Sequence, residues 1–195
     1  KMFETFKRRK TKIRIPKVSR PKFGSNKGLP LDPYILGLWL GDGNSYGARI
    51  TTQDEEVVES LREWCRLNGG EVVVDKTQNS GKATTYSVKG PNKDRRGDNG
   101  RYETSSESLY GKLRMMGLCK RDSKIEENVG RHIPEEYLRA SYEDRLALLR
   151  GLMDTDGCHH SGSLSIFIQK EGRLVEDVIR LIEGLGGFPR VHKTN

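Results

Sequence analysis

The sequence has few cysteines, no long apolar run and no signal-peptide pattern at its start. Cys65, Cys119 and Cys158 lie far apart among the 195 residues and cannot form a closed set of disulfides, which indicates a reducing compartment. The longest apolar stretch, Tyr34–Leu40, is far shorter than the roughly 18 residues that a membrane-spanning helix needs. The first residues are basic with no apolar block behind them. We therefore expect an intracellular protein of the cytoplasm or nucleoid, with no membrane partner.

Acidic residues are almost absent from the first 28 positions. The whole chain holds 35 Lys and Arg against 27 Asp and Glu, a net charge of +8. Residues 1–28 contain eleven basic residues against Glu4 alone, a net charge of +10, so the rest of the chain is nearly neutral. A basic arm over residues 1–30 fits binding to nucleic-acid phosphates or to an anionic membrane surface, and a solvated linker is equally compatible.

Two segments of the chain repeat one pattern. Ile35–Gly43 aligns with Leu149–Gly157 at an offset of 114, and the helices expected after them align at an offset of 117. We therefore expect a tandem duplication of a helix–strand–helix–strand unit. The first copy is assigned to residues 31–140 and the second to residues 141–195, and the second copy is expected to be incomplete.

Local patterns predict the remaining elements. Thr52 and Glu55 form a capping box that should begin a helix, and Gly69-Gly70 should end it. Two strands are expected at residues 71–76 and 83–89, with helical segments at residues 106–118 and 133–140. Four large apolar residues at helical positions are expected in the core, namely Trp39, Trp64, Met115 and Met116.

Each repeated helix carries small residues four positions apart. These are Gly37 and Gly41 in one helix, and Gly151 and Thr155 in the other. Residues four apart share a helix face, and small ones let two backbones approach closely. The pattern predicts that the two helices pack in parallel, so that their C-terminal ends meet.

Each of these helices ends in an aspartate followed by a glycine suited to a left-handed position. An acid at a helix C-terminus is unfavourable by about 0.3–1 kcal/mol, and two acids brought together repel each other. A bound divalent cation would offset this, and hard carboxylate oxygens suit Mg²⁺, with Mn²⁺ as the alternative. Either aspartate alone would be interpreted as part of an exposed polar turn, whereas the duplication of Asp42 and Asp156 favours a functional pair.

The two repeated segments resemble the signature motifs of the LAGLIDADG homing endonucleases. The longer segments LDPYILGLWLGDG and HIPEEYLRASYEDRLALLRGLMDTDG resemble the endonuclease domains embedded in inteins, and the resemblance extends from Leu31 to the end of the chain. It implies an α+β fold of two pseudo-symmetric repeats (αββαββα-like) in a monomer. The motif helices would pack at the interface, and antiparallel strands would form a DNA-binding saddle.

The resemblance also implies an activity, which is metal-dependent cleavage of both strands of a specific double-stranded DNA site. Asp42 and Asp156 would bind the metal, and the residue before each acid, Gly41 and Thr155, belongs to the same predicted set. The parent chain would also hold a flanking intein splicing domain and a host protein. A catalytically degenerate DNA-binding module of the same family is the alternative function.

Further site residues follow from the family pattern. Gln53 and Gln169 correspond to polar residues near the attacking water. Arg131 stands where intein endonucleases usually have a lysine before Ile-Pro; an arginine can stabilise an anion but cannot act as a base. The predicted DNA-binding residues are Arg8, Arg9, Arg49, Thr51, Lys76, Lys89 and Ser165.

Strand alternation supports this placement independently of the resemblance. Arg49, Thr51 and Gln53 share one face of their strand. In the second copy, Ser165, Phe167 and Gln169 share the polar face, and the opposite, more apolar face holds Leu164, Ile166 and Ile168.

Three other interpretations are weaker. Asp154-Thr155-Asp156 could be a phosphatase-type site, but such a site follows a buried strand, and the preceding residues have helical spacing. An EF-hand lacks its further acids. Cys158-His159-His160 could bind zinc, although a plain loop is the simpler interpretation because no second Cys/His pair is near.

Overall fold

The computed structural model describes residues 28–75, 83–91, 95–96, 102–103, 106–119, 131–160, 164–170 and 172–193. The fold is mixed α+β with small antiparallel sheets, as predicted. The helices are α2 (Pro33–Asp42), α3 (Glu55–Leu67), α4 (Leu109–Met115), α5 (Glu135–Leu138), α6 (Tyr142–Asp156) and α7 (Arg173–Gly184). The strands are β1 (Arg49–Thr52), β2 (Glu71–Val74), β3 (Thr84–Lys89), β4 (Arg95–Arg96), β5 (Tyr102–Glu103), β6 (Gly157–His160) and β7 (Leu164–Phe167).

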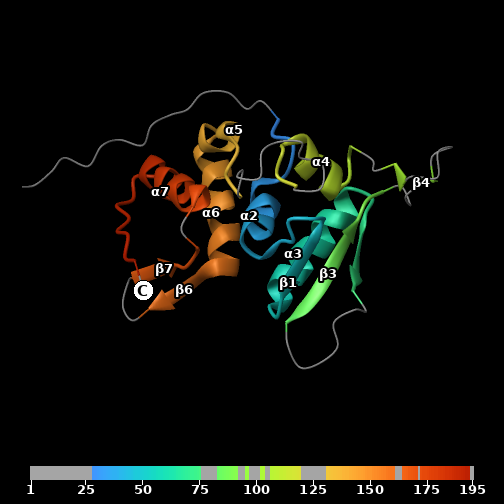
Figure 1. The fold of residues 1–195 in the computed structure, drawn as a ribbon, viewed down its shortest axis with the longest axis horizontal. Coiled ribbons are helices and arrows are strands. Elements are labelled where there is room, and N and C mark those ends of the chain that lie inside the picture. Colours follow the sequence, from blue (N-terminus) through green and yellow to red (C-terminus); the bar gives the residue numbers. More distant parts are fainter. Residues whose placement is uncertain are drawn as a thin grey trace, which may run out of the picture.

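Helices α2 and α6 lie side by side at the centre of the molecule (Figure 1). A Cβ added at Gly37 would lie 2.9 Å from the Gly151 Cα, and one added at Gly41 would lie 2.7 Å from the Thr155 Cβ. These contacts advance in the same direction along both helices, so the helices pack in parallel. The predicted contact between the two small-residue faces is therefore confirmed.

The glycines after the two motif helices do not adopt the expected left-handed conformation. Gly43 has φ −74° and Gly157 has φ −95°, so both are extended. A Cβ at Gly43 would lie 2.5 Å from Cδ1 of the Trp39 ring, and one at Gly157 would lie 2.8 Å from the Met153 Cα. Glycine is required at both positions because the chain turns closely past its own helix.

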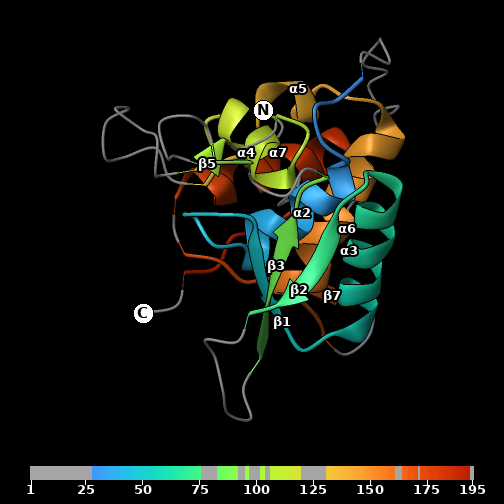
Figure 2. The ribbon, with the colours of Figure 1, turned by 90° about the vertical axis from the view of Figure 1, so that its right-hand side faces the viewer.

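The first sheet has the antiparallel order β1-β3-β2 (Figure 2). One face of β1 is buried: Ile50 and Thr52, together with Ala48 just before the strand, are buried, whereas Arg49 is exposed. The amphipathic helix α3 packs against all three strands and buries Val57, Val58, Leu61 and Cys65. The strand predicted at residues 83–89 is confirmed as β3, and the one predicted at residues 71–76 is present as the shorter β2, with residue 76 outside the described residues. The predicted capping box is wrong by two residues, because Asp54 caps α3 by accepting from the Glu56 backbone, and Thr52 accepts from Asp54 instead.

The antiparallel pair β6–β7 forms a separate sheet, which lies, like α7, on the opposite side of α2 and α6 from the first sheet (Figure 1). Residues 158–160, interpreted as a loop, belong to strand β6 and pair with β7. The expected apolar face of β7 is also wrong. Phe167 packs against the core, and Ile168 is 66% exposed because it lies beyond the end of β7.

Among the described residues, one cluster of buried side chains joins the two halves of the fold through α2 and α6. Trp39 is fully buried, and Trp64 and Met116 pack against the cluster, as predicted. The prediction that Met115 lies in the core is wrong, because this side chain is 74% exposed at the last position of the short helix α4. The division into repeats at residue 140 stays a prediction.

Candidate functional site at the ends of α2 and α6

The C-terminal ends of α2 and α6 bring Asp42 and Asp156 together. A Cβ at Gly41 would lie 3.3 Å from Asp156 Oδ2, so the last turn of α2 adjoins that carboxylate. Burial raises the pKa of Asp42, and the Arg131 charge opposes this shift. Burial and then the Asp42 charge raise the pKa of Asp156, and Arg131 and Gln169 oppose it. The acids are therefore partly buried, close enough to affect each other, and only partly compensated.

The two predicted glutamines differ in their contacts. Gln169 Nε2 donates a hydrogen bond of 2.6 Å to Asp156 Oδ2, which fixes this carboxylate from the segment after β7. Gln53 follows β1 and is exposed, and within the described residues no hydrogen bond joins it to Asp42. The structure thus brings Gln169 to the acid pair and leaves Gln53 facing solvent.

Arg131 closes the C-terminal end of α2. Its Nη1 donates to the Leu40 carbonyl at 2.8 Å and also to the Gly41 carbonyl, and its Nη2 donates to the Gly43 carbonyl. The guanidinium lies over the Trp39 ring, 5.8 Å from its centroid. A cation here complements both the unpaired carbonyls and the negative end of the helix dipole. Burial lowers the pKa of Arg131, and the charges of Asp156 and Asp42 oppose that effect.

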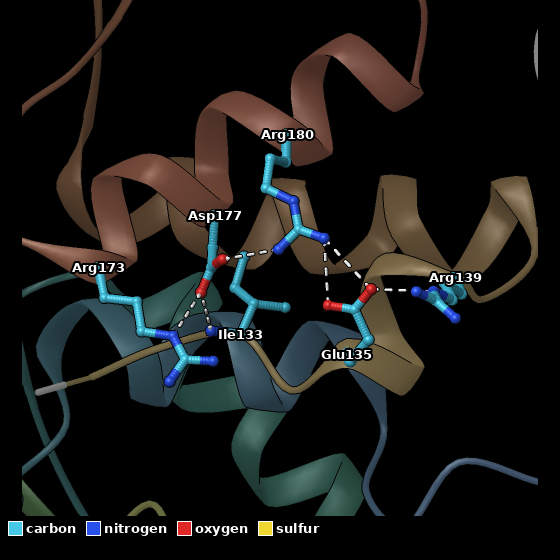
Figure 3. A network of polar contacts seen from close by, with 6 residues as sticks. All are labelled: Ile133, Glu135, Arg139, Arg173, Asp177 and Arg180. Carbon is cyan, nitrogen blue, oxygen red and sulfur yellow. Dashed lines mark hydrogen bonds and ion pairs between the residues drawn. The ribbon is translucent and has the colours of Figure 1, made fainter. Parts of the chain in front are cut away.

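The segment that carries Arg131 is anchored to α7 (Figure 3). Asp177, which is 3% exposed, accepts a hydrogen bond of 3.0 Å from the Ile133 backbone and forms an ion pair of 3.3 Å with Arg180. Arg180 also pairs with Glu135 at 3.1 Å. Sequence reasoning missed this anchor, since nothing local marks Asp177 as different from other acids of an amphipathic helix.

The oxygen atoms at this point suit a divalent cation. Mg²⁺ is commonly bound by one or two carboxylates together with substrate phosphates, and Asp42 and Asp156 supply that number. Within the described part of the chain, no group of three or more Asp, Glu, His or Cys residues could hold a metal ion. The Thr155 hydroxyl donates to the Gly151 and Leu152 carbonyls of its own helix. The donor set therefore fits a cation that also uses ligands from outside the protein.

The predicted DNA-binding residues lie on several elements. The Arg49 side chain is 54% exposed and pairs with Asp75 at 3.4 Å, and the Thr51 hydroxyl shares a hydrogen bond of 2.8 Å with Thr85. Lys89 ends β3 and is exposed, as is Ser165 on β7. Lys76, Arg8 and Arg9 lie outside the described residues.

The phosphatase interpretation of residues 154–156 is wrong. These residues form the end of helix α6 and do not follow a buried strand. Asp154 accepts a hydrogen bond of 2.9 Å from the Tyr34 hydroxyl, and burial together with this acid raises the pKa of Tyr34 to about 12.

Among the described residues no helix is both long and apolar enough to cross a bilayer.

Comparison with known proteins gives an informative similarity. No protein-family model matches the chain. Over 154 residues, 79% of its length, the chain is 32% identical to a protein from Mycobacterium intracellulare described as the replicative DNA helicase DnaB. The matched region covers 19% of that protein, so the chain spans about a fifth of its relative's length.

Proposed function

We propose that the chain is a site-specific DNA endonuclease domain of the LAGLIDADG type, carried within a longer host protein. The observation that carries the proposal is the meeting of Asp42 and Asp156 at the ends of two parallel helices packed through small residues. Each of these helices is followed by antiparallel strands and an amphipathic helix, which supports a pseudo-twofold arrangement of two repeats.

Each residue around the acid pair has a separate role in the proposed phosphodiester hydrolysis. Asp42 and Asp156 would hold a divalent cation, Mg²⁺ or Mn²⁺, which would supply water activation and charge neutralisation on the phosphate. Gln169 orients the Asp156 carboxylate through its 2.6 Å hydrogen bond. Arg131 contributes a fixed positive charge close to both acids. Double-stranded DNA would lie along the polar strand faces that carry Arg49 and Ser165.

The similarity to the helicase supports the same proposal. That relative is described as a replicative DNA helicase, and the match covers only 19% of it. A domain inserted into a host protein of this kind, with intein splicing segments on either side, fits this partial coverage.

Isosteric substitution of the acids tests the proposal. In the full parent chain, Asp42→Asn and Asp156→Asn should each abolish cleavage of the intact insertion site in Mg²⁺, because the amide keeps the shape but loses the charge that binds the cation. Site-specific binding should stay intact or tighten, since repulsion of the phosphate is removed. Asp154→Asn is the matched control, as it lies on the same helix and its amide oxygen can still accept from Tyr34. Comparable Mg²⁺-dependent cleavage by either Asp42→Asn or Asp156→Asn would show that the mechanism is wrong.

A catalytically degenerate DNA-binding module is the second candidate. The observation that favours it is Arg131, which replaces the family's lysine and donates to the Gly41 carbonyl. If this candidate is correct, the parent chain binds its site but cuts in neither Mg²⁺ nor Mn²⁺. Cleavage restored by Arg131→Lys would identify this residue as the cause.

A further inference from the structure

One predicted metal-binding residue already has a different cationic partner in the structure. Glycine has no side chain, so the carbonyl is the only oxygen that Gly41 can offer to a cation. That carbonyl accepts a hydrogen bond from Arg131, which also holds the carbonyls of Leu40 and Gly43. The end of α2 is thus occupied by a charged group of the protein itself.

The same guanidinium partly balances the two aspartates. Its charge lowers the pKa of both Asp42 and Asp156, against the effect of burial. Within the described residues no ion pair of 4.0 Å or less joins Arg131 to either carboxylate, so the effect acts through space. A divalent cation between the acids would face repulsion from this fixed charge, which is strong in a partly desolvated site.

Arg131 is also held in place from two sides. The Trp39 ring lies beneath the guanidinium, and Asp177 binds the backbone of Ile133, two residues further along the chain. The side chain therefore cannot leave α2 without breaking several contacts, whereas a free surface arginine could turn away at little cost.

We propose that Arg131 is an internal cation that competes with the divalent cation at the end of α2. Its guanidinium satisfies the helix carbonyls and balances the two aspartates, and a cation bound at the Gly41 carbonyl would displace it from there. This inference rests on the proposed function of the acid pair, and makes Arg131 a positioning residue that sets the affinity of the site.

The proposal predicts effects of opposite sign on two measurable properties. Removing the guanidinium should destabilise the metal-free protein, because the carbonyls and the acids lose their partner. It should also tighten cation binding, because the competitor is gone. A purely structural arginine would instead weaken cation binding on removal, since the acid pair would lose its geometry.

Terbium luminescence without DNA tests this on the full chain. Tb³⁺ binds carboxylate oxygens, and indole excitation sensitises it when Trp39 is near. Arg131→Met should lower the half-saturating Tb³⁺ concentration several-fold. Arg131→Lys keeps the positive charge but loses the planar guanidinium with its paired N–H donors, so the half-saturating Tb³⁺ concentration should fall less. Arg139→Met removes the same charge at a position 71% exposed and should match wild type. Asp156→Asn should lose the signal, which places the ion at the acid pair.

Thermal unfolding provides the second readout. Arg131→Met should unfold at a lower temperature than wild type in EDTA and recover most of the difference in millimolar Mg²⁺. Unchanged or weaker Tb³⁺ binding by Arg131→Met overturns the inference. An equally large decrease in the half-saturating Tb³⁺ concentration of Arg139→Met also overturns it. If Arg131→Met does not fold, Arg131→Lys decides by the same criteria. These measurements need no cleavage, so a chain that never cuts DNA still tests the competition, and one that cuts can still contradict it.

Discussion

Protonation of the acid pair depends on burial more than on its partners. Asp42 and Asp156 both have raised pKa values, with burial as the largest cause, although Arg131 opposes the shift at both. The ordinary pKa of such a carboxyl is 3.8, so the folded protein holds these protons more tightly than the unfolded chain does. Proton uptake therefore favours the folded state.

The resulting pH dependence is a prediction for single residues. Without divalent cations, the contribution of these two groups to stability should be greatest below the unfolded pKa and should fall as pH rises through the folded values. Asp156→Asn is uncharged at every pH, so it should unfold at a higher temperature than wild type at neutral pH. The difference in melting temperature between Asp156→Asn and wild type should disappear as the pH falls toward 3.8. Melting curves in EDTA across this range check it, and a lower melting temperature for Asp156→Asn at neutral pH would contradict it.

The contact between α2 and α6 depends on backbone proximity at two glycines. An added Cβ at Gly37 meets the backbone of α6 at Gly151 and Leu152, each 2.9 Å away, and not the end of a flexible side chain. Neither helix can yield locally, because both are packed into the core.

Gly37→Ala should therefore destabilise the fold, although alanine is the better helix former. Overpacking of this kind costs about 1–3 kcal/mol, which exceeds the gain in helix propensity of about 1 kcal/mol. Gly47→Ala is the matched control, because no atom lies within 4 Å of a Cβ there and its φ is not in the left-handed region. Urea denaturation of both variants measures the difference. Equal midpoints would show that the helices are less closely packed than described.

Charge is distributed unevenly over the whole molecule. Residues 1–28 carry a net charge of +10, and the body is nearly neutral. The arm up to residue 27 lies outside the described residues, so its role is inferred from the sequence.

Deletion of residues 1–28 should weaken DNA binding without changing sequence preference. Each phosphate contact contributes about −0.9 to the slope of log K against log salt, so the slope should become shallower by several units. Binding titrations at four or five salt concentrations, on specific and unrelated DNA, measure both quantities. An unchanged slope and affinity would show that the arm is only a linker.

Periodic, local features of this protein were determined by the sequence alone. The polar face of β1 and the aspartate–glycine ends of α2 and α6 were both predicted. Each depends on neighbours within a few residues. The small-residue faces even predicted which two distant helices would meet, because a stripe of glycine has few uses other than close packing.

Tertiary structure alone decided how the charged residues are partnered. Arg131 donates to carbonyls about 90 residues earlier in the chain, and Asp177 accepts from a backbone amide 44 residues away. The sequence suggested an anion-stabilising role for Arg131 but not its position on the end of α2. A hydrogen bond between distant segments leaves no periodic trace in either one, because its geometry exists only once both helices have packed.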